Sequence, residues 1–312
     1  MILLFKEGIV LKKNNQPEVT PRIRPNYEVL APLGARINFK NSGKSISRTD
    51  GTFASAYRGQ SMELEDLRPY VYGDNLRDVD WKATSRTGEV MIRNYTADKR
   101  KQIIFIGDVG PNMEGSMPDG SSKKECEIIT IGTAAYLAGR GGADYCVVCN
   151  DPYKNTPGHY GNGARWLEQE LSALQTALFN DNYEDLQGLL RTILDMPMRG
   201  VAICLVTDLG GLYHLDENLL RAAAAGRDFY VFQVSDAEWG GKAFYNAQSK
   251  RRIPEFLTFD NRFAADIRKR WDECQSVVRR KLRRAGVYYA YLEDLREIPE
   301  TVTLVLNGEI TD

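Results

Sequence analysis

The sequence is most informative at an apolar run that ends in an acid, Ile103-Ile104-Phe105-Ile106-Gly107-Asp108. Consecutive residues of a strand point to opposite faces of its sheet, so a strand made only of large apolar residues must be covered on both faces. Parallel sheets of α/β proteins have this double cover. The run therefore predicts a buried strand at residues 103–106, with Asp108 at its carboxyl end.

A second run of this kind, residues 201–206, ends at Thr207-Asp208 and predicts a central strand. Between and after the two runs, short apolar stretches alternate with amphipathic ones. Further strands are predicted at residues 145–149, 229–234 and 287–292, and helices at 126–140, 164–179, 216–225 and 263–285. Such alternation is typical of a parallel sheet with helices on both faces. We therefore expect an α/β domain at residues 101–312, with a doubly wound, mostly parallel sheet of the Rossmann type.

The composition is that of an ordinary globular protein. Hydrophobic residues make up 43% of the 312 residues and charged residues 27%, which argues against long disorder and against a membrane bundle. No window approaches the ~18 consecutive apolar residues of a membrane span. The 41 basic and 42 acidic residues nearly balance, so a nucleic-acid site would have to be a local patch. Five cysteines, an odd number in a long chain, favour reduced thiols and a cytoplasmic location.

The first hundred residues differ from the rest. Residues 11–26 hold three prolines and few large apolar residues, which predicts an extended arm and not a helix. Between residues 58 and 101, nine basic and eight acidic residues are interleaved, which predicts an ion-pair network. Arg86-Thr87-Gly88 predicts a tight turn before a strand at residues 89–95. We therefore expect residues 1–100 to form an arm and a charged β segment ahead of the α/β domain.

The charged segment carries a recognisable signature. Its characteristic residues are Glu63, Arg68, Tyr70, Gly73, Asp74, Arg77, Asp80, Trp81, Arg86 and Gly88. They fall in three elements that resemble the E-F-x-x-x-R-x-Y, P-G-D-D-x-R-x-I-D-W and A-R-T-G elements of the family numbered 58 among domains of unknown function (DUF58). The resemblance extends to about residue 295. It implies that a von Willebrand factor A-like domain follows the signature.

This resemblance also implies a role. Members of that family are typically encoded with MoxR-type AAA+ ATPases and are thought to help assemble or activate other proteins. The expected function is therefore a non-enzymatic, protein-binding adaptor or scaffold. The sequence has neither a GxxxxGK[ST] nor a GxSxG motif and only two histidines, so it lacks the signatures of a P-loop, a serine hydrolase and a zinc enzyme.

The resemblance further implies a metal-ion-dependent adhesion site. Asp108 and Asp208 follow two predicted strands, where open α/β sheets bind ligands. An adhesion site of this kind holds Mg²⁺ or Mn²⁺ with a D-x-S-x-S motif and a threonine from another loop. Here Gly110 and Asn112 replace the serines, and only Thr156 lies in a suitable loop. We expect a degenerate site at Asp108, Asn112 and Asp208, empty or weakly metallated; alternatively, both aspartates cap loops or helices.

Two other functions stay open. The segment 262–285 carries nine basic and three acidic residues, which is compatible with nucleic-acid binding. Its apolar stripe consists of Trp271, Cys274, Val278 and Leu282. Because such a stripe marks a helix with one buried face, a solvated face explains the cations better than phosphate binding does. An acidic protein surface is an equally good partner for this patch. A metal-dependent hydrolase is the third reading, although no second acidic ligand pair or general base accompanies Asp108.

Overall fold

The computed structural model describes residues 22–37, 62–71, 74, 79–97, 101–180, 182–196, 200–237, 245–246, 251–252 and 261–309. The chain forms two units. One consists of residues 47–100, and the other combines residues 1–46 with residues 101–312. The described part of the N-terminal arm thus belongs to the α/β unit and not to the charged segment.

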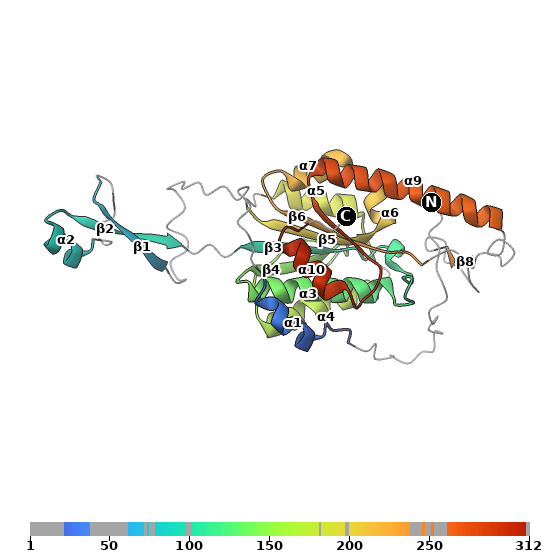
Figure 1. Ribbon diagram of the computed structural model, residues 1–312, viewed down its shortest axis with the longest axis horizontal. Helices are drawn as coiled ribbons and strands as arrows, with labels where there is room; N and C mark the ends of the chain where they lie inside the picture. The colour runs from blue at the N-terminus through green and yellow to red at the C-terminus, as the bar shows by residue number, and fades with distance from the viewer. Residues whose placement is uncertain are drawn as a thin grey trace. The chain divides into compact units, whose positions relative to one another are not determined.

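Five parallel strands form the sheet of the α/β unit. They are β3 (Gln102–Gly107), β4 (Asp144–Cys149), β5 (Ala202–Asp208), β6 (Phe229–Val234) and β9 (Tyr288–Leu292). Their order across the sheet is β4-β3-β5-β6-β9. Figure 1 labels the first four of these strands. The chain moves outward from β3 to β4 and then returns to β5, so its winding reverses between β3 and β5. The predicted doubly wound sheet is confirmed, and each predicted strand coincides with an observed one within two residues.

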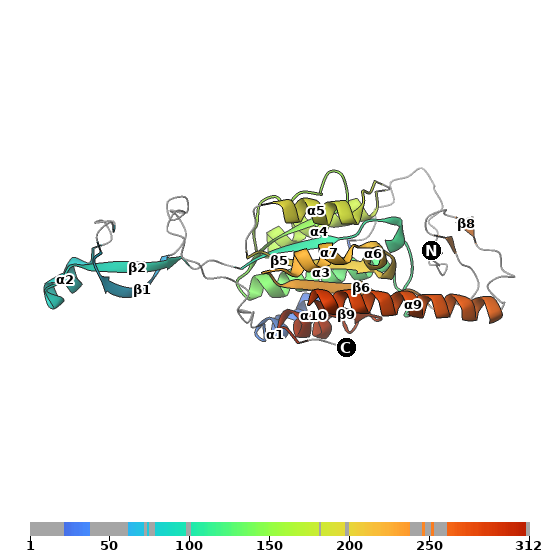
Figure 2. The same ribbon diagram turned by 90° about the horizontal axis from the view of Figure 1, so that it is seen from above.

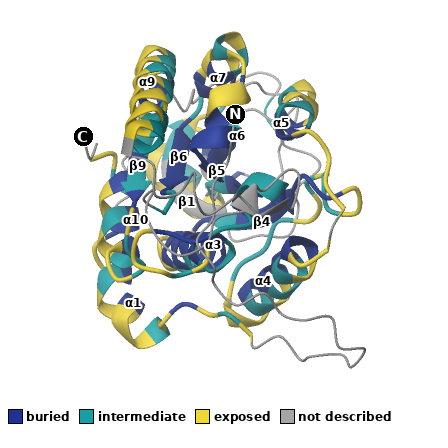
Figure 3. Cartoon of the chain, turned by 90° about the vertical axis from the view of Figure 1, so that its right-hand side faces the viewer, coloured by how far each residue is buried: buried dark blue, intermediate teal, exposed yellow. Residues whose placement is uncertain are grey.

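Helices cover both faces of this sheet, which Figure 3 shows between two helix layers. One layer contains α1 (Tyr27–Gly34), α3 (Lys123–Arg140), α4 (Ala164–Leu178) and α10 (Ile298–Leu306). The other contains α5 (Leu186–Asp195), α6 (Leu209–His214), α7 (Glu217–Ala224) and α9 (Asn261–Ala285). Each layer encloses its own apolar core against the sheet. Figure 2 shows the long α9 on the side of the sheet that carries β9.

The four predicted helices are confirmed as α3, α4, α7 and α9. The stripe on α9 packs as predicted, because Val278 and Leu282 are buried and Trp271 and Cys274 lie against the same core. Helices α5, α6 and α10 are absent from the predicted pattern, and α6 has only six residues. Helix α3 begins at Lys123, three residues earlier than predicted. The short elements are η2 (Pro111–Met113) in the loop after β3 and the antiparallel pair β7 (Tyr245–Asn246) and β8 (Arg251–Arg252).

The charged segment forms an antiparallel pair, β1 (Met62–Pro69) and β2 (Met91–Ala97), with α2 (Trp81–Thr87) between the two strands in sequence. Asp80 caps α2, since its carboxylate accepts hydrogen bonds from the N–H groups of Lys82 and Ala83 at 2.9 and 3.0 Å. Gly88 ends the helix with a φ of 76°, a left-handed conformation that glycine adopts at low cost. The predicted turn at residues 86–88 is therefore the end of a short helix, and the following strand begins two residues later than predicted.

The described part of the N-terminal arm docks on the α/β unit. Residues 22–26 are not helical, as predicted, and residues 11–21 lie outside the described residues. Helix α1 follows: the ring of Tyr27 lies 5.4 Å from that of Tyr136, and its hydroxyl donates to Oε1 of Glu168 at 3.0 Å. These contacts join α1 to α3 and α4.

Candidate functional site

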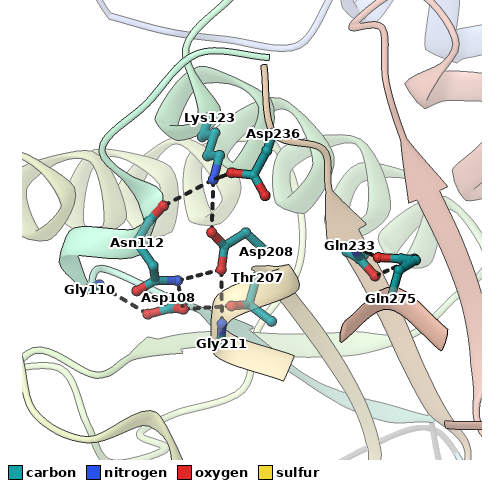
Figure 4. Close-up of polar contacts among 10 residues, drawn as sticks. All are labelled: Asp108, Gly110, Asn112, Lys123, Thr207, Asp208, Gly211, Gln233, Asp236 and Gln275. Carbon is teal, nitrogen blue, oxygen red and sulfur yellow. Dashed lines mark hydrogen bonds and ion pairs between the residues drawn. The ribbon is translucent and has the colours of Figure 1, made fainter. Parts of the chain in front are cut away.

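The predicted site residues lie where the sheet reverses its winding. Asp108 follows β3 and Asp208 ends β5, so both stand at the carboxyl ends of the strands that flank the reversal. Figure 4 shows them together with Asn112, Thr207 and Lys123. Open α/β sheets bind ligands at this edge. The two aspartates are 2% and 0% exposed, so they lie beneath the surface of the edge.

Both carboxylate oxygens of Asp108 accept hydrogen bonds. Its Oδ2 accepts from Oγ1 of Thr207 at 2.6 Å and from Nδ2 of Asn112 at 2.7 Å. Its Oδ1 accepts from the N–H of Gly110 at 3.0 Å and from Nδ2 of Asn150 at 3.2 Å. Burial raises the pKa of Asp108 above its ordinary value, and the hydrogen bonds from Thr207 and Asn112 offset only part of that rise.

Asn112 joins the two aspartates. Its Nδ2 donates to Oδ1 of Asp208 at 2.8 Å as well as to Asp108. Ionised carboxylates can only accept hydrogen bonds, so the amide must turn its NH2 group toward them. Oδ1 of Asp208 also accepts from the N–H of Gly211 at 2.9 Å and thereby caps α6. The alternative prediction, that these aspartates cap helices or loops, therefore holds for Asp208 at α6 and for Asp108, which accepts from Gly110 in its own loop.

A buried lysine completes the group. The side chain of Lys123 is 2% exposed. Its Nζ donates to Oδ2 of Asp208 at 2.8 Å, to the backbone oxygen of Asn112 at 3.1 Å and to Oδ1 of Asp236. Burial alone would lower the pKa of Lys123, but the carboxylates of Asp208 and Asp236 outweigh burial and raise it above its ordinary value. We call Asp108, Asn112, Lys123, Asp208 and Asp236 the Lys123 cluster.

An acidic residue of α3, Glu127, lies close to the Lys123 cluster but has no hydrogen-bond partners of this kind. Glu127 is fully buried, and neither oxygen of its carboxyl group has a hydrogen-bond partner among the described residues. A Cβ atom on Gly107 would clash with Oε1 of Glu127, so this side chain packs directly against the end of β3. Burial, followed by the charge of Asp108, raises the pKa of Glu127 well above its ordinary value, and the nearby backbone N–H of Asp108 offsets only part of the rise.

As arranged, the Lys123 cluster does not fit a divalent cation. All four carboxylate oxygens of Asp108 and Asp208 accept hydrogen bonds. A hard cation needs several oxygens that are directed at it, whereas here the ammonium of Lys123 and the amide N–H groups of Asn112 face the carboxylates. Within the described ranges, no three His, Cys, Asp or Glu side chains form a group suited to a metal ion.

The fourth predicted ligand lies elsewhere. Thr156 is exposed, and its hydroxyl donates to Oδ1 of Asn155 at 3.0 Å. The hydroxyl that contacts Asp108 belongs instead to Thr207, the last residue before the second strand-end acid. Position at the end of a strand, and not position in a loop, is therefore the signal that would have found this threonine.

Besides Thr207, three members of the network are missing from the predicted site residues. Asn150 follows β4 and Asp236 follows β6, so the strand-end rule that selects Asp108 and Asp208 would also have selected these two. Lys123 has no comparable signal, because its nearest carboxylate partner lies 85 residues away in the sequence. Only the folded topology reveals that pairing.

Two glycines make the close packing possible. A Cβ atom on Gly110 would lie 2.5 Å from Oδ1 of Asn112, and one on Gly211 would lie 2.9 Å from Oδ2 of Asp108. Both distances are shorter than real Cβ contacts. A serine in place of Gly110 therefore cannot coexist with the Asn112 side chain in this position. Gly110 therefore makes room for the side-chain amide of Asn112.

Four of the described signature residues of the charged segment have structural roles: Arg68, Asp74, Asp80 and Gly88. Arg68 pairs with Asp74 through two hydrogen bonds of 2.7 Å, and Asp80 and Gly88 delimit α2. Trp81 is 70% exposed. Tyr70 is half-buried and Arg86 is exposed. Gly73, Arg77 and the side chain of Glu63 lie outside the described residues.

Exposed aromatic residues lie on the loops beside the Lys123 cluster. Tyr153 follows β4 and is 88% exposed, and Tyr183 precedes α5 and is 53% exposed. Their loops are tied together: the N–H of Glu184 donates to the backbone oxygen of Asn150 at 2.6 Å, and Nδ2 of Asn155 donates to Oε2 of Glu184 at 3.0 Å. An open groove of about 400 Å³ is lined by these loops and α5. Neither tyrosine lines the groove, and we call the groove together with Tyr153 and Tyr183 the β4-edge surface.

Comparison with known proteins adds a family match. A family model described as "Protein of unknown function DUF58" matches residues 66–239, more than half of the 312 residues. No significant sequence relative was found among curated proteins. None of the helices within the described ranges is long and apolar enough to cross a membrane.

Three solved structures are similar at low identity. The conserved hypothetical protein BatB from Bacteroides thetaiotaomicron is 13% identical, with 67% of this chain and 98% of that chain covered and a TM-score of 0.43. An aerotolerance-related membrane protein from Bacteroides fragilis is 11% identical, with 67% and 99% covered and a TM-score of 0.41. A von Willebrand factor type A protein from Catenulispora acidiphila is 12% identical, with 68% and 43% covered and a TM-score of 0.35. Similarities of this size do not carry an argument about function.

Proposed function

The chain belongs to the DUF58 family, since the family model matches more than half of it, and we propose that it is a non-enzymatic, protein-binding adaptor. In this proposal it acts with a MoxR-type AAA+ ATPase in the assembly or activation of other proteins. The contact face is the carboxyl edge of the sheet, around Asp108, Asp208 and the loops beside them. Five free cysteines support a cytoplasmic setting for this work.

The observation that carries the proposal is the β4-edge surface. Tyr153 and Tyr183 are large and exposed, and they belong to the same loops as residues that line a groove. Exposed tyrosines of this kind are enriched in protein interfaces, because they bury much apolar area and still offer a hydroxyl. The loops beneath them are held by hydrogen bonds to Asn150 and Glu184. A partner would therefore meet a preorganised surface, which lowers the entropic cost of binding.

Asp108, Asn112 and Asp208 have a supporting role in this proposal. We interpret them as the remnant of an adhesion-type metal site whose residues now form hydrogen bonds with one another. They fix the loop after β3 and the start of α6, and Asn150 connects them to the β4-edge surface. Any binding of Mg²⁺ or Mn²⁺ there is expected to be weak, because few oxygens are available to a cation.

The test is direct binding of a purified MoxR-type ATPase from the same organism, measured by biolayer interferometry. Replacement of both Tyr153 and Tyr183 by alanine should weaken binding by at least about tenfold, since interface tyrosines are frequent hot spots. Val29→Ala, at a residue of α1 that is 49% exposed, serves as the control and should leave binding unchanged. Equal binding by the double variant and the wild type would exclude this surface as the contact.

A second candidate function rests on α9. Eight of its basic side chains are exposed: Arg262, Arg268, Lys269, Arg270, Arg279, Arg280, Arg283 and Arg284. Such a face could bind nucleic acid through phosphate contacts. The test is binding of a duplex oligonucleotide at several salt concentrations. Affinity that falls steeply with salt would support this function, and no binding at low salt would exclude it.

A further inference from the structure

The ammonium group of Lys123 has the surroundings of a bound cation. It is buried, and each of its three N–H bonds meets an oxygen acceptor. The acceptors come from three separate segments: the loop after β3, the end of β5 and the segment after β6. A metal ion held by loops gathers oxygens from separate segments in a similar way.

The helix itself does not favour a lysine at this position. Lys123 is the first residue of α3, an 18-residue helix, and the N-terminus of a helix attracts anions and repels cations. Burial also removes the hydration and the rotamer freedom of the side chain. Lysine is therefore stable here only because Asp208 and Asp236 face it.

The other side of the cluster is closed by an amide. Nδ2 of Asn112 lies between the carboxylates of Asp108 and Asp208, and Gly110 leaves the space that this side chain requires. Ammonium and amide together supply hydrogen-bond donors where a metal site would supply the metal. The sequence changes at positions 110 and 112 and the lysine at position 123 are thus parts of one arrangement.

We propose that the Lys123 ammonium occupies a cation position at this edge of the sheet, between Asp208, Asp236 and the backbone oxygen of Asn112, so that an internal side chain takes the place of a metal ion. The edge is then held together without a metal. This inference concerns the cluster alone, and it stands whether or not the β4-edge surface binds a protein.

A consequence follows for recognition. An adhesion-type metal keeps one coordination position open for an acidic group of the partner. The Lys123 ammonium has no N–H bond left to offer, because all three are used within the chain. Binding at this edge therefore cannot proceed by capture of a carboxylate on the cation, and a chelator should not affect it.

The test is calorimetric titration of Mn²⁺ into the full chain after treatment with EDTA. The wild type should give no saturable heat. Lys123→Ala removes the ammonium and leaves the carboxylates of Asp208 and Asp236 and the backbone oxygen of Asn112 around a vacated position, so this variant should gain Mn²⁺ binding and a melting temperature that rises with Mn²⁺. The further change Asp208→Asn should abolish that gain.

The matched control is Lys101→Ala. Lys101 also pairs with a buried carboxylate, since its Nζ lies 2.7 Å from Oδ2 of Asp228, but it does not belong to the cluster. Loss of that lysine should not create Mn²⁺ binding. Gain of Mn²⁺ binding in both variants would show a general effect of removed positive charge and would overturn the assignment of a specific cation position.

Two further results would overturn the proposal. The first is saturable Mn²⁺ binding by the wild type that Asp208→Asn removes. The second is a folded Lys123→Ala chain that binds no Mn²⁺. If Lys123→Ala does not fold, the melting temperature of the wild type is measured with and without Mn²⁺. A melting temperature that Mn²⁺ does not change supports the proposal. A melting temperature that Mn²⁺ raises in the wild type but not in Asp208→Asn contradicts it.

Discussion

Two buried polar clusters lie near β6, and they are built from different chemistry (Figure 4). The Lys123 cluster contains charged groups. The other cluster is neutral: Nε2 of Gln233 donates to Oε1 of Gln275 at 2.8 Å, and Nε2 of Gln275 donates back to Oε1 of Gln233 at 3.2 Å. The hydroxyl of Tyr289 donates to the same Oε1 of Gln233 at 2.9 Å. These residues come from β6, α9 and β9, so the neutral cluster connects α9 to the sheet by hydrogen bonds.

The difference shows how each cluster depends on its members. Each glutamine amide supplies both donors and acceptors, so the members of the neutral cluster satisfy one another's hydrogen bonds at any ordinary pH. The Lys123 cluster is stable only while its ammonium balances the carboxylates. Loss of one partner there leaves a buried charge, whereas loss of a glutamine leaves unpaired neutral groups. The edge that carries the proposed function is therefore the more sensitive of the two regions.

Removal of Lys123 should have the largest effect. Lys123→Ala leaves the buried Asp208 and the partly buried Asp236 without their cation, so the free energy of unfolding should fall by about 3–5 kcal/mol. Lys101→Ala, at a pair with a more exposed lysine, should lower it by about 1 kcal/mol. Urea denaturation of both variants gives the comparison. Equal losses would mean that the Lys123 cluster is an ordinary ion pair.

Replacement of Glu127 should stabilise the protein. Its pKa is raised in the folded chain above the ordinary value of 4.5. The stability that the protonated acid contributes is therefore fully present below that value and is lost as the pH rises toward the folded pKa. Glu127→Gln has no proton to lose and should increase the free energy of unfolding by about 2 kcal/mol at mildly alkaline pH.

The same variant should have little effect in acid, where Glu127 is protonated in both states. Urea unfolding of wild type and variant at a series of pH values measures the difference. A variant that is less stable than the wild type at alkaline pH would show that the carboxylate has a partner in the folded protein.

Disruption of the neutral cluster should have a smaller effect that does not depend on pH. Gln275→Leu leaves Gln233 and Tyr289 with fewer partners, and the free energy of unfolding should fall by about 1–2 kcal/mol. None of the three groups titrates near neutral pH, so the loss should be constant across that range. A loss that changes with pH would mean that the two clusters are coupled through β6.

The smallest effect is expected in the charged segment. Arg68 and Asp74 form an ion pair with good geometry, but the Arg68 side chain is 42% exposed. Exposed ion pairs contribute little to stability because water and salt screen them. Arg68→Ala should leave the melting temperature of the chain unchanged in a thermal denaturation followed by circular dichroism. A clear drop would indicate that this signature pair is buried against another surface.

Much of the fold could be predicted, because apolar periodicity is a local property. The runs at residues 103–106 and 201–206 identify the central strands, and the strand-end rule places Asp108 and Asp208 together. The sequence does not predict α6, because this helix is short and its N-cap residue, Asp208, is also the last residue of a strand.

The site was only half predictable, because its key contact is not local. Lys123 stands among polar residues at the start of a helix, and nothing in those neighbours indicates that it is buried. Its partners Asp208 and Asp236 are 85 and 113 residues away. Thr156 was chosen by loop position, whereas register in the sheet selects Thr207. Side chains that meet through topology require the structure.

The central claim is that the Lys123 ammonium fills a cation position at this edge. The most direct measurement is an NMR spectrum of the lysine side-chain ammonium groups in ¹⁵N-labelled protein, recorded with and without a small amount of Mn²⁺. A buried ammonium with three acceptors exchanges its protons slowly, so Lys123 should give a resolved signal that disappears in Lys123→Ala. Mn²⁺ should leave that signal unchanged. Absence of the signal in the wild type, or its selective broadening by Mn²⁺, would contradict the account.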